Sequence, residues 1–175
     1  MKAFADLLDR LAFSPGRTAK LKLMQDYFRS TPDPDRGYAL AVLTDGLPLS
    51  FPVRRILTDL MARRLDPELY RLSRDYVGDT AETVALAWPE PAHPGPPLRL
   101  SEIVARLALI DRTALGSQLE VWLDGLDSTG RWALLKLLTG ALRVGVSARL
   151  AKTAIAEMAD KSVDDVEELW HGLRP

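Results

Sequence analysis

The sequence contains no cysteine, so no disulfide framework can hold the fold together. It has no run of about 18 apolar residues, the length that a membrane-spanning helix needs. Residues 1–11 place acidic side chains among apolar ones, unlike the apolar segment of a signal peptide. Neither sign of charge is in excess, because 23 basic residues stand against 24 acidic ones. These absences favour a cytoplasmic protein that is stabilised by a hydrophobic core.

Histidine is also scarce. The two histidines, His93 and His171, are far apart in the sequence and have no cysteine to join them, so we expect no metal site. No grouping of nucleophile, base and acid suggests a hydrolase or another self-sufficient enzyme. We therefore expect no catalytic residue in this chain.

Apolar residues recur at helical spacing along nearly the whole chain, and no convincing alternating strand pattern appears. Helix-start signals divide this pattern: Ser14-Pro15, Asp79 with Glu82, Ser101, Ser117, and Ser162 with Asp165. The predicted helices cover about 2–13, 15–29, 33–45, 53–65, 66–78, 101–110, 117–124, 127–139 and 163–171, and two more begin at 79 and 147.

Five prolines among residues 89–97 predict a surface loop between two of these helices, since proline interrupts regular structure. No fixed repeat relates the helical segments, which counts against a solenoid. The 175 residues are a little more than the usual size of one domain. The sequence therefore predicts one domain, an all-α orthogonal bundle of ten or eleven helices, and we expect it to be a monomer.

Basic residues are concentrated in one stretch. Residues 131–156 contain no acidic side chain and five basic ones: Arg131, Lys136, Arg143, Arg149 and Lys152. In contrast, residues 157–168 hold six acids and a single basic residue, Lys161. The first region is therefore a candidate surface for phosphate groups, and the second belongs away from them.

The centre of the basic stretch, Gly140 to Ser147, predicts a helix end, a tight turn and a second helix. Gly140 can adopt the left-handed conformation that ends a helix, and Gly145 lets a ligand approach the backbone closely. Ser147 can cap the next helix and leave amide donors available at its N-terminus. With Arg143, these amides form a candidate phosphate site. Helix punctuation alone also explains both glycines.

The segment Leu138–Ser147, LTGALRVGVS, resembles the Leu-x-Gly-Lys-Leu-Arg-aliphatic-Gly element in the N-terminal DNA-binding domain of ATP-dependent DNA ligases. Tyr76–Glu82 is similar to a Gly-Asp helix start of that domain. Leu98–Glu102 and Gly116-Ser117 are similar to its next two helix openings. The segment Phe4–Tyr38 resembles bacterial members of the group, so the resemblance extends over nearly the whole chain.

The resemblance implies a domain that binds nicked double-stranded DNA through the phosphate backbone and the minor groove, without preference for base sequence. The basic segment 10–29 adds two further candidates, Lys20 and Lys22. Helical spacing distributes the cations of this segment over more than one side, so a solvent-exposed helix face explains them equally well. At Ala141 the family has a lysine, so one phosphate partner is missing here. The candidate DNA-binding residues are Gly140, Arg143, Gly145, Ser147, Gly116, Ser117, Lys20, Lys22 and Arg149.

ATP-dependent ligases become adenylylated on the lysine of a Lys-x-Asp-Gly motif, because the reaction needs an amine nucleophile. None of the six lysines of this chain precedes x-Asp-Gly. Trp122–Gly125 has the ending of the motif without the amine, and we interpret it as core packing followed by a helix end. We expect the chain to be inactive alone and to be part of a longer ligase, whose catalytic domains would contact it and use ATP and Mg²⁺.

The alternative is an α-helical module that binds another protein. Such a module would use an exposed apolar groove, and its affinity would depend modestly on salt. A DNA-binding domain would lose affinity steeply as salt rises.

Overall fold

The computed structural model describes residues 1–47, 49, 51–90, 96–140 and 142–170, which form eleven α-helices and no strand. The all-α prediction is therefore confirmed. The helices are α1 (Lys2–Phe13), α2 (Arg17–Ser30), α3 (Asp35–Leu43), α4 (Val53–Ala62), α5 (Pro67–Val77), α6 (Thr80–Ala87), α7 (Leu100–Leu109), α8 (Leu115–Gly125), α9 (Ser128–Thr139), α10 (Ala148–Met158) and α11 (Val163–Trp170). None of them is long and apolar enough to cross a membrane.

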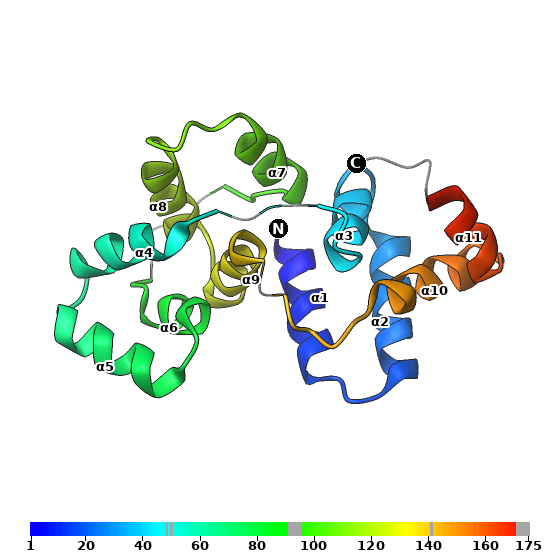
Figure 1. The fold of residues 1–175 in the computed structure, drawn as a ribbon, viewed down its shortest axis with the longest axis horizontal. Coiled ribbons are helices and arrows are strands. Elements are labelled where there is room, and N and C mark those ends of the chain that lie inside the picture. The colour runs from blue at the N-terminus through cyan, green and yellow to red at the C-terminus, as the bar shows by residue number, and fades with distance from the viewer. Residues whose placement is uncertain (48, 50, 91–95, 141, 171–175) are drawn as a thin grey trace.

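Helix α9 lies at the centre of the molecule (Figure 1). It packs against α1 on one side and α6 on the other. Helices α4–α8 form one group, and α1–α3 with α10 and α11 form the other (Figure 1). The sequence explains the central position, because α9 carries an unbroken apolar run from Ala133 to Leu135 and again at Leu137 and Leu138, all of them buried. A helix that is apolar on most sides is stable only when other helices surround it.

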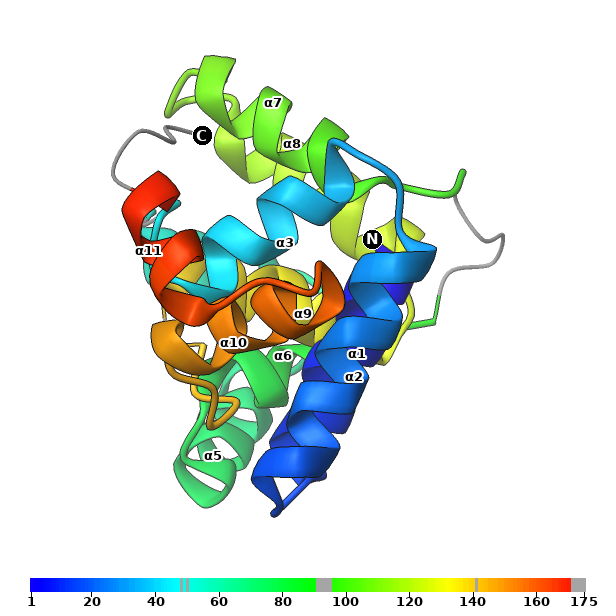
Figure 2. The same ribbon diagram turned by 90° about the vertical axis from the view of Figure 1, so that its right-hand side faces the viewer.

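The chain leaves the second group after α3 and returns to it at α10. Helix α10 packs against α2, α3 and α11. Figure 2 turns this side toward the viewer, with α2, α3, α10 and α11 lying across it. Residues of α2 and α10 are therefore neighbours, although more than a hundred positions separate them in the sequence.

Several predicted helix ends are confirmed. Ser147 is the N-cap of α10, where its hydroxyl accepts from the Leu150 amide at 3.2 Å. Ser162 and Asp165 cap each other at the start of α11, with N···O distances of 3.0 and 3.1 Å. Gly140 ends α9 with a φ of 65°. These caps were predictable because each is made by residues close together in the sequence.

Other predicted helix starts were wrong by one turn or less. Helix α2 begins at Arg17 rather than at Pro15, and Ser14 instead ends α1. The short link between the two packed helices needs these residues to reverse the chain. Ser101 and Ser117 lie inside the first turns of α7 and α8 and do not cap them.

The start of α7 shows the physical reason for one such error. The amide of Ser101 donates to a carboxylate oxygen of Asp35 at 3.0 Å, and Asp35 belongs to α3. A side chain distant in sequence therefore satisfies an amide that a local cap would otherwise take. Capping rules consider only residues that are close in the sequence, so they cannot predict a partner on another helix.

Candidate nucleic-acid interface

The basic stretch 131–156 does not form one surface, because its first cation is buried. The side chain of Arg131 is 0% exposed. Its Nε donates to the Leu123 carbonyl at 2.8 Å, and its two terminal nitrogens donate to the carbonyls of Trp88 and Pro89, each at 3.2 Å. Arg131 thus joins the ends of α6 and α8, and it is not available to DNA.

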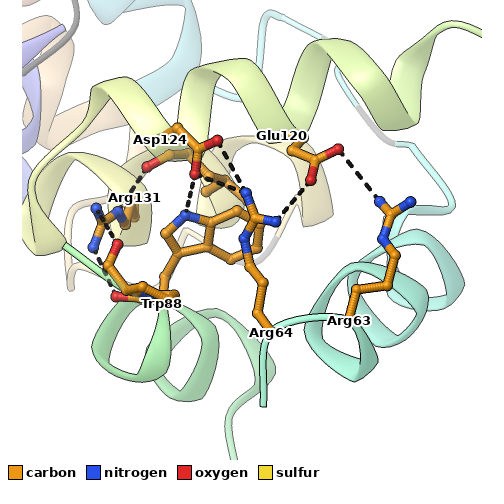
Figure 3. A network of polar contacts seen from close by, with 8 residues as sticks. Arg63, Arg64, Trp88, Glu120, Asp124 and Arg131 are labelled. Carbon is orange, nitrogen blue, oxygen red and sulfur yellow. Dashed lines mark hydrogen bonds and ion pairs between the residues drawn. The ribbon is translucent and has the colours of Figure 1, made fainter. Parts of the chain in front are cut away.

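A polar network lies beside Arg131 (Figure 3). Asp124 accepts from the indole Nε1 of Trp88 at 2.8 Å and from Arg64 at 3.0 Å. The Arg64 guanidinium also lies over the Trp88 ring, 4.3 Å from its centroid. Glu120 accepts from Arg64 at 2.7 Å and from Arg63 at 3.3 Å. The network connects α4 and α8 to the end of α6, and its partners are satisfied within the protein.

The tetrapeptide Trp122–Gly125 has the structural role that we predicted. Trp122 is buried, and α8 ends at Gly125. Asp124 takes part in the network with Arg64 and Trp88. The resemblance of this segment to the ending of an adenylation motif therefore reflects packing and a helix end.

Lys136, the second cation of the stretch, is buried and forms an ion pair with Asp79, the N-cap of α6. Burial alone would raise the pKa of Asp79, but hydrogen bonds from Lys136 and the amides of Glu82 and Ala81 lower it below its usual value. The carboxylate thus stays charged and holds α6 against α9. Lys136 is a structural residue, and it too is not available to DNA.

The remaining cations of the stretch lie after α9. The Nζ of Lys152 lies 4.9 Å from the centroid of the Trp170 ring, so this cation contacts α11. Arg143 and Arg149 are exposed. Two of the five basic residues are therefore presented to solvent without a packing role.

The segment between α9 and α10 forms the predicted turn. Gly145 has a φ of 66°, a conformation that side-chain-bearing residues rarely adopt. Val144 before it is buried and anchors the turn to the core. Ser147 then caps α10. Ala141, where the ligase family has a lysine, lies outside the described residues, as do His93 and His171.

The Gly145 turn borders a cleft of about 370 Å³, which we call the anion cleft. Its walls come from α2 with the link before it, from the turn, and from α10. Every charged residue in its lining is basic, which makes the cleft attractive to an anion. The lining residues are Pro15, Arg17, Lys20, Gly145, Ser147, Arg149, Leu150 and Thr153.

Two helix N-termini meet at the anion cleft. Helix α2 has no side-chain cap, and neither α2 nor α10 has an acid in its first turn. Among the described residues, the amides of Ala148 and Arg149 have no acceptor. Each helix instead carries an exposed arginine in its first turn, Arg17 or Arg149, although the helix dipole favours an acid there by about 0.3–1 kcal/mol. The protein thus carries a small local cost that a bound anion would relieve.

The candidate DNA-binding residues fall into two sets, those that line the anion cleft and those that do not. Gly145, Ser147, Arg149 and Lys20 line the anion cleft, and we had not predicted that Arg17 joins them. The spacing of Arg17 and Lys20, three residues apart on one helix, is the signal that could have identified it. Arg143 is exposed but does not line the cleft.

Three other candidates lie elsewhere. Lys22 borders a different cleft with Arg10, Asp9 and Asp26. Its neighbourhood has mixed charge, which weakens attraction to phosphate. Lys22 is therefore separated from the anion cleft, although it is two residues from Lys20.

Gly116 and Ser117 lie in the first turn of α8 and border a cleft of about 310 Å³. Asp59 and Arg63 are its charged lining residues, so its charge is balanced. Helices α8 and α10 lie on opposite sides of α9 (Figure 1). The structure therefore does not bring Gly116 and Ser117 together with the Gly145 turn.

The acidic segment 157–168 begins in the last turn of α10 and continues along α11. Glu157, near the end of α10, accepts from the Gln25 side chain of α2 at 2.8 Å. One end of the α2 and α10 pair is thus basic and the other acidic. Comparison with known proteins adds no identification, since no protein-family model and no curated protein matches the chain.

Proposed function

We propose that the chain binds the phosphate backbone of nicked duplex DNA at the anion cleft, as the DNA-binding domain of an ATP-dependent DNA ligase. The single observation that carries the binding is the meeting of two helix N-termini, each with an exposed arginine in its first turn, at a cleft without acids. Helix N-termini and arginines bind phosphate through amides and charge-assisted hydrogen bonds. Contacts to phosphate oxygens carry no information about the bases, so this mode of binding is independent of sequence.

The ligase assignment rests on the resemblance of Leu138–Ser147 and the other quoted segments to that domain. The chain itself supplies no adenylation lysine, so strand sealing is assigned to catalytic domains in a longer protein, with ATP and Mg²⁺ as their cofactors. Incubation of this chain with ATP and Mg²⁺ should leave all six lysines unmodified in mass spectrometry. A stable adenylate on any of them would contradict the assignment.

The test of the proposal is the affinity of the chain for nicked duplex at two salt concentrations. We expect weak binding, because the net charge is only −1 and the cations are few. Between about 50 and 200 mM salt the affinity should fall by roughly one decade or more. Fluorescence anisotropy with duplexes of unrelated sequence would measure both quantities.

Helices α2 and α10 offer a matched control for the position of the site. The variant Arg17→Met/Arg149→Met removes the two arginines at the cleft. Arg29→Met/Lys161→Met removes one charge near the other end of α2 and one just beyond the other end of α10. The first should weaken binding at least about tenfold and lower the salt slope by about two. The second should change affinity by less than about threefold. Equal losses would mean that net charge, not the cleft, governs binding.

One observation favours a second candidate, binding to another protein. Phe13 and Leu86 are 82% and 74% exposed. With Trp132 they border a groove of about 440 Å³, whose charged lining residues are Asp9 and Glu82. Exposed apolar grooves of this kind accept amphipathic helices. The variant Phe13→Ser/Leu86→Ser would abolish such an interaction and leave the salt-dependent affinity for DNA unchanged.

A further inference from the structure

Lys20 lines the anion cleft, but its ammonium group points into the protein. The residue lies in the second turn of α2 and is 8% exposed. Its Nζ donates to the carbonyl oxygen of Val144 at 2.7 Å and to that of Gly145 at 3.0 Å. An ammonium group has three donors, so two of them are committed to the turn that precedes α10.

The contact between Lys20 and Gly145 is also steric. A Cβ built on Gly145 would overlap Nζ of Lys20, at a separation that real Cβ atoms essentially never show. The ammonium therefore occupies the space that a side chain at position 145 would need. A side chain at position 145 would be disfavoured by the positive φ, and it would also have to displace the ammonium.

The two hydrogen bonds fix the orientation of the peptide groups in the turn. In a planar trans peptide the N–H points opposite to the C=O. Because the carbonyls of Val144 and Gly145 face Lys20, the amides of Gly145 and Val146 are directed away from it. Ser147 follows directly and caps α10, so the position of the turn sets the position of the helix N-terminus.

We propose that Lys20 is a positioning residue that fastens the Gly145 turn to α2 and so holds the two helix N-termini of the anion cleft in place. It acts through the turn and does not itself bind phosphate. This inference rests on the proposed function of the cleft. It deepens that function, because it makes the arrangement of the amides depend on one buried cation from the other helix.

Substitution by arginine separates the two roles. If Lys20 bound phosphate, Lys20→Arg would preserve binding, because a guanidinium is a good phosphate partner. In the positioning role, a compact ammonium fits the space beside Gly145 and a larger planar group does not. We therefore expect Lys20→Arg and Lys20→Met to weaken binding to nicked duplex by similar factors, about tenfold each.

The salt slope provides a second readout that loss of stability would not change. Arg149→Met should lower the slope by about one, because it removes a phosphate contact. Lys20→Met should leave the slope as in the parent while the affinity falls. Lys22→Met is the matched control, since this exposed lysine lies two residues further along α2. It should change the affinity by less than about twofold.

Gly145→Ala tests the same contact from the other side and serves if Lys20→Met does not fold. It should weaken binding with an unchanged slope, because the new methyl group displaces the ammonium. Where both single variants fold, the double variant Lys20→Met/Gly145→Ala should bind better than the product of the two single effects predicts, since the clash is absent.

Specific outcomes would overturn the proposal. Binding as tight as the parent by folded Lys20→Met or by Gly145→Ala would show that the contact does not position the cleft. Retained binding by Lys20→Arg, with a slope lowered by about one in Lys20→Met, would make Lys20 a phosphate ligand. Both results leave the proposed function intact. Its own failure would appear separately, as salt-independent binding in the parent or as an unchanged affinity in Arg17→Met/Arg149→Met.

Discussion

Arg131 and Lys136 belong to the same acid-free stretch as Arg143 and Arg149, yet the structure gives the two pairs opposite roles. The first pair lies within α9 and is buried. The second pair follows α9 and is exposed. Local sequence is basic and apolar around all four residues, so composition does not distinguish the pairs.

The difference lies in what the other helices present to each cation. Arg131 meets carbonyl oxygens at the ends of α6 and α8, and Lys136 meets the carboxylate of Asp79. Arg149 lies in the first turn of its own helix and lines a cleft together with the basic residues Arg17 and Lys20 of α2. A cation with anionic or carbonyl partners stabilises the fold, whereas a cation without them is available to a ligand. The comparison teaches that a basic stretch becomes a binding site only where tertiary structure leaves its charges unmatched.

The largest effect on this comparison should come from Arg131→Met. The substitution leaves three carbonyl oxygens without their buried donor, and we expect a loss of about 3 kcal/mol in the free energy of unfolding. For a protein of this size, the melting temperature should fall by roughly 6–12 °C. Circular dichroism melts would measure it, with Arg149→Met, expected within about 0.5 kcal/mol of the parent, as the control. Similar melting temperatures for the two variants would remove the distinction between the pairs.

Arg149→Glu should move stability and binding in opposite directions. An acid in the first turn of α10 favours the helix dipole, so the free energy of unfolding should rise by about 1 kcal/mol and the melting temperature by roughly 2–4 °C. The affinity for nicked duplex should fall at least about tenfold, because the proposed phosphate contact becomes a repulsion. Thermal melts and anisotropy titrations would measure the two changes. A loss of stability would identify Arg149 as a structural residue.

The buried pair of Lys136 and Asp79 should make stability depend on pH. The pKa of Asp79 is lower in the folded protein than in the unfolded chain, so its contribution is present above the unfolded value of about 3.9 and is lost as the pH falls through the folded value. Asp79→Asn keeps a helix cap and removes the charge. The parent should therefore melt at a higher temperature than this variant at pH 7, and the difference should shrink as the pH falls below the unfolded value. A difference that is constant over this range would contradict the role of the charge.

The smallest effect should come from Arg143→Ala. Arg143 is exposed, is not among the residues that line the anion cleft, and lies two residues before Gly145. We expect a loss of affinity of about threefold for all duplex sequences and a melting temperature within about 1 °C of the parent. Parallel titrations with two unrelated duplexes would test the uniformity. A tenfold loss would place phosphate nearer to Arg143 than to Arg149 and would shift the site along the turn.

Helix content and many helix ends could be predicted from the sequence because they depend on neighbours along the chain. The apolar period of α1, the left-handed Gly140 and the caps at Ser147 and Ser162 all arise from residues within one or two turns. The prediction of Ser101 as a cap failed where Asp35, on another helix, takes its amide. The predicted helix start at Gly116-Ser117 was also wrong, because α8 begins two residues before Ser117.

The sequence by itself determined an all-α fold, a glycine turn before α10 and a surplus of basic residues around it. The tertiary structure alone decided which of those residues are buried and which line the anion cleft. It buried Arg131 and Lys136 against partners from other helices, turned Lys20 toward the carbonyls of the turn, and brought Arg17 beside Arg149. The physical reason is the distance along the chain over which each interaction acts. Helix propensity and capping act over a few residues, whereas desolvation and charge pairing depend on contacts between segments far apart in the chain.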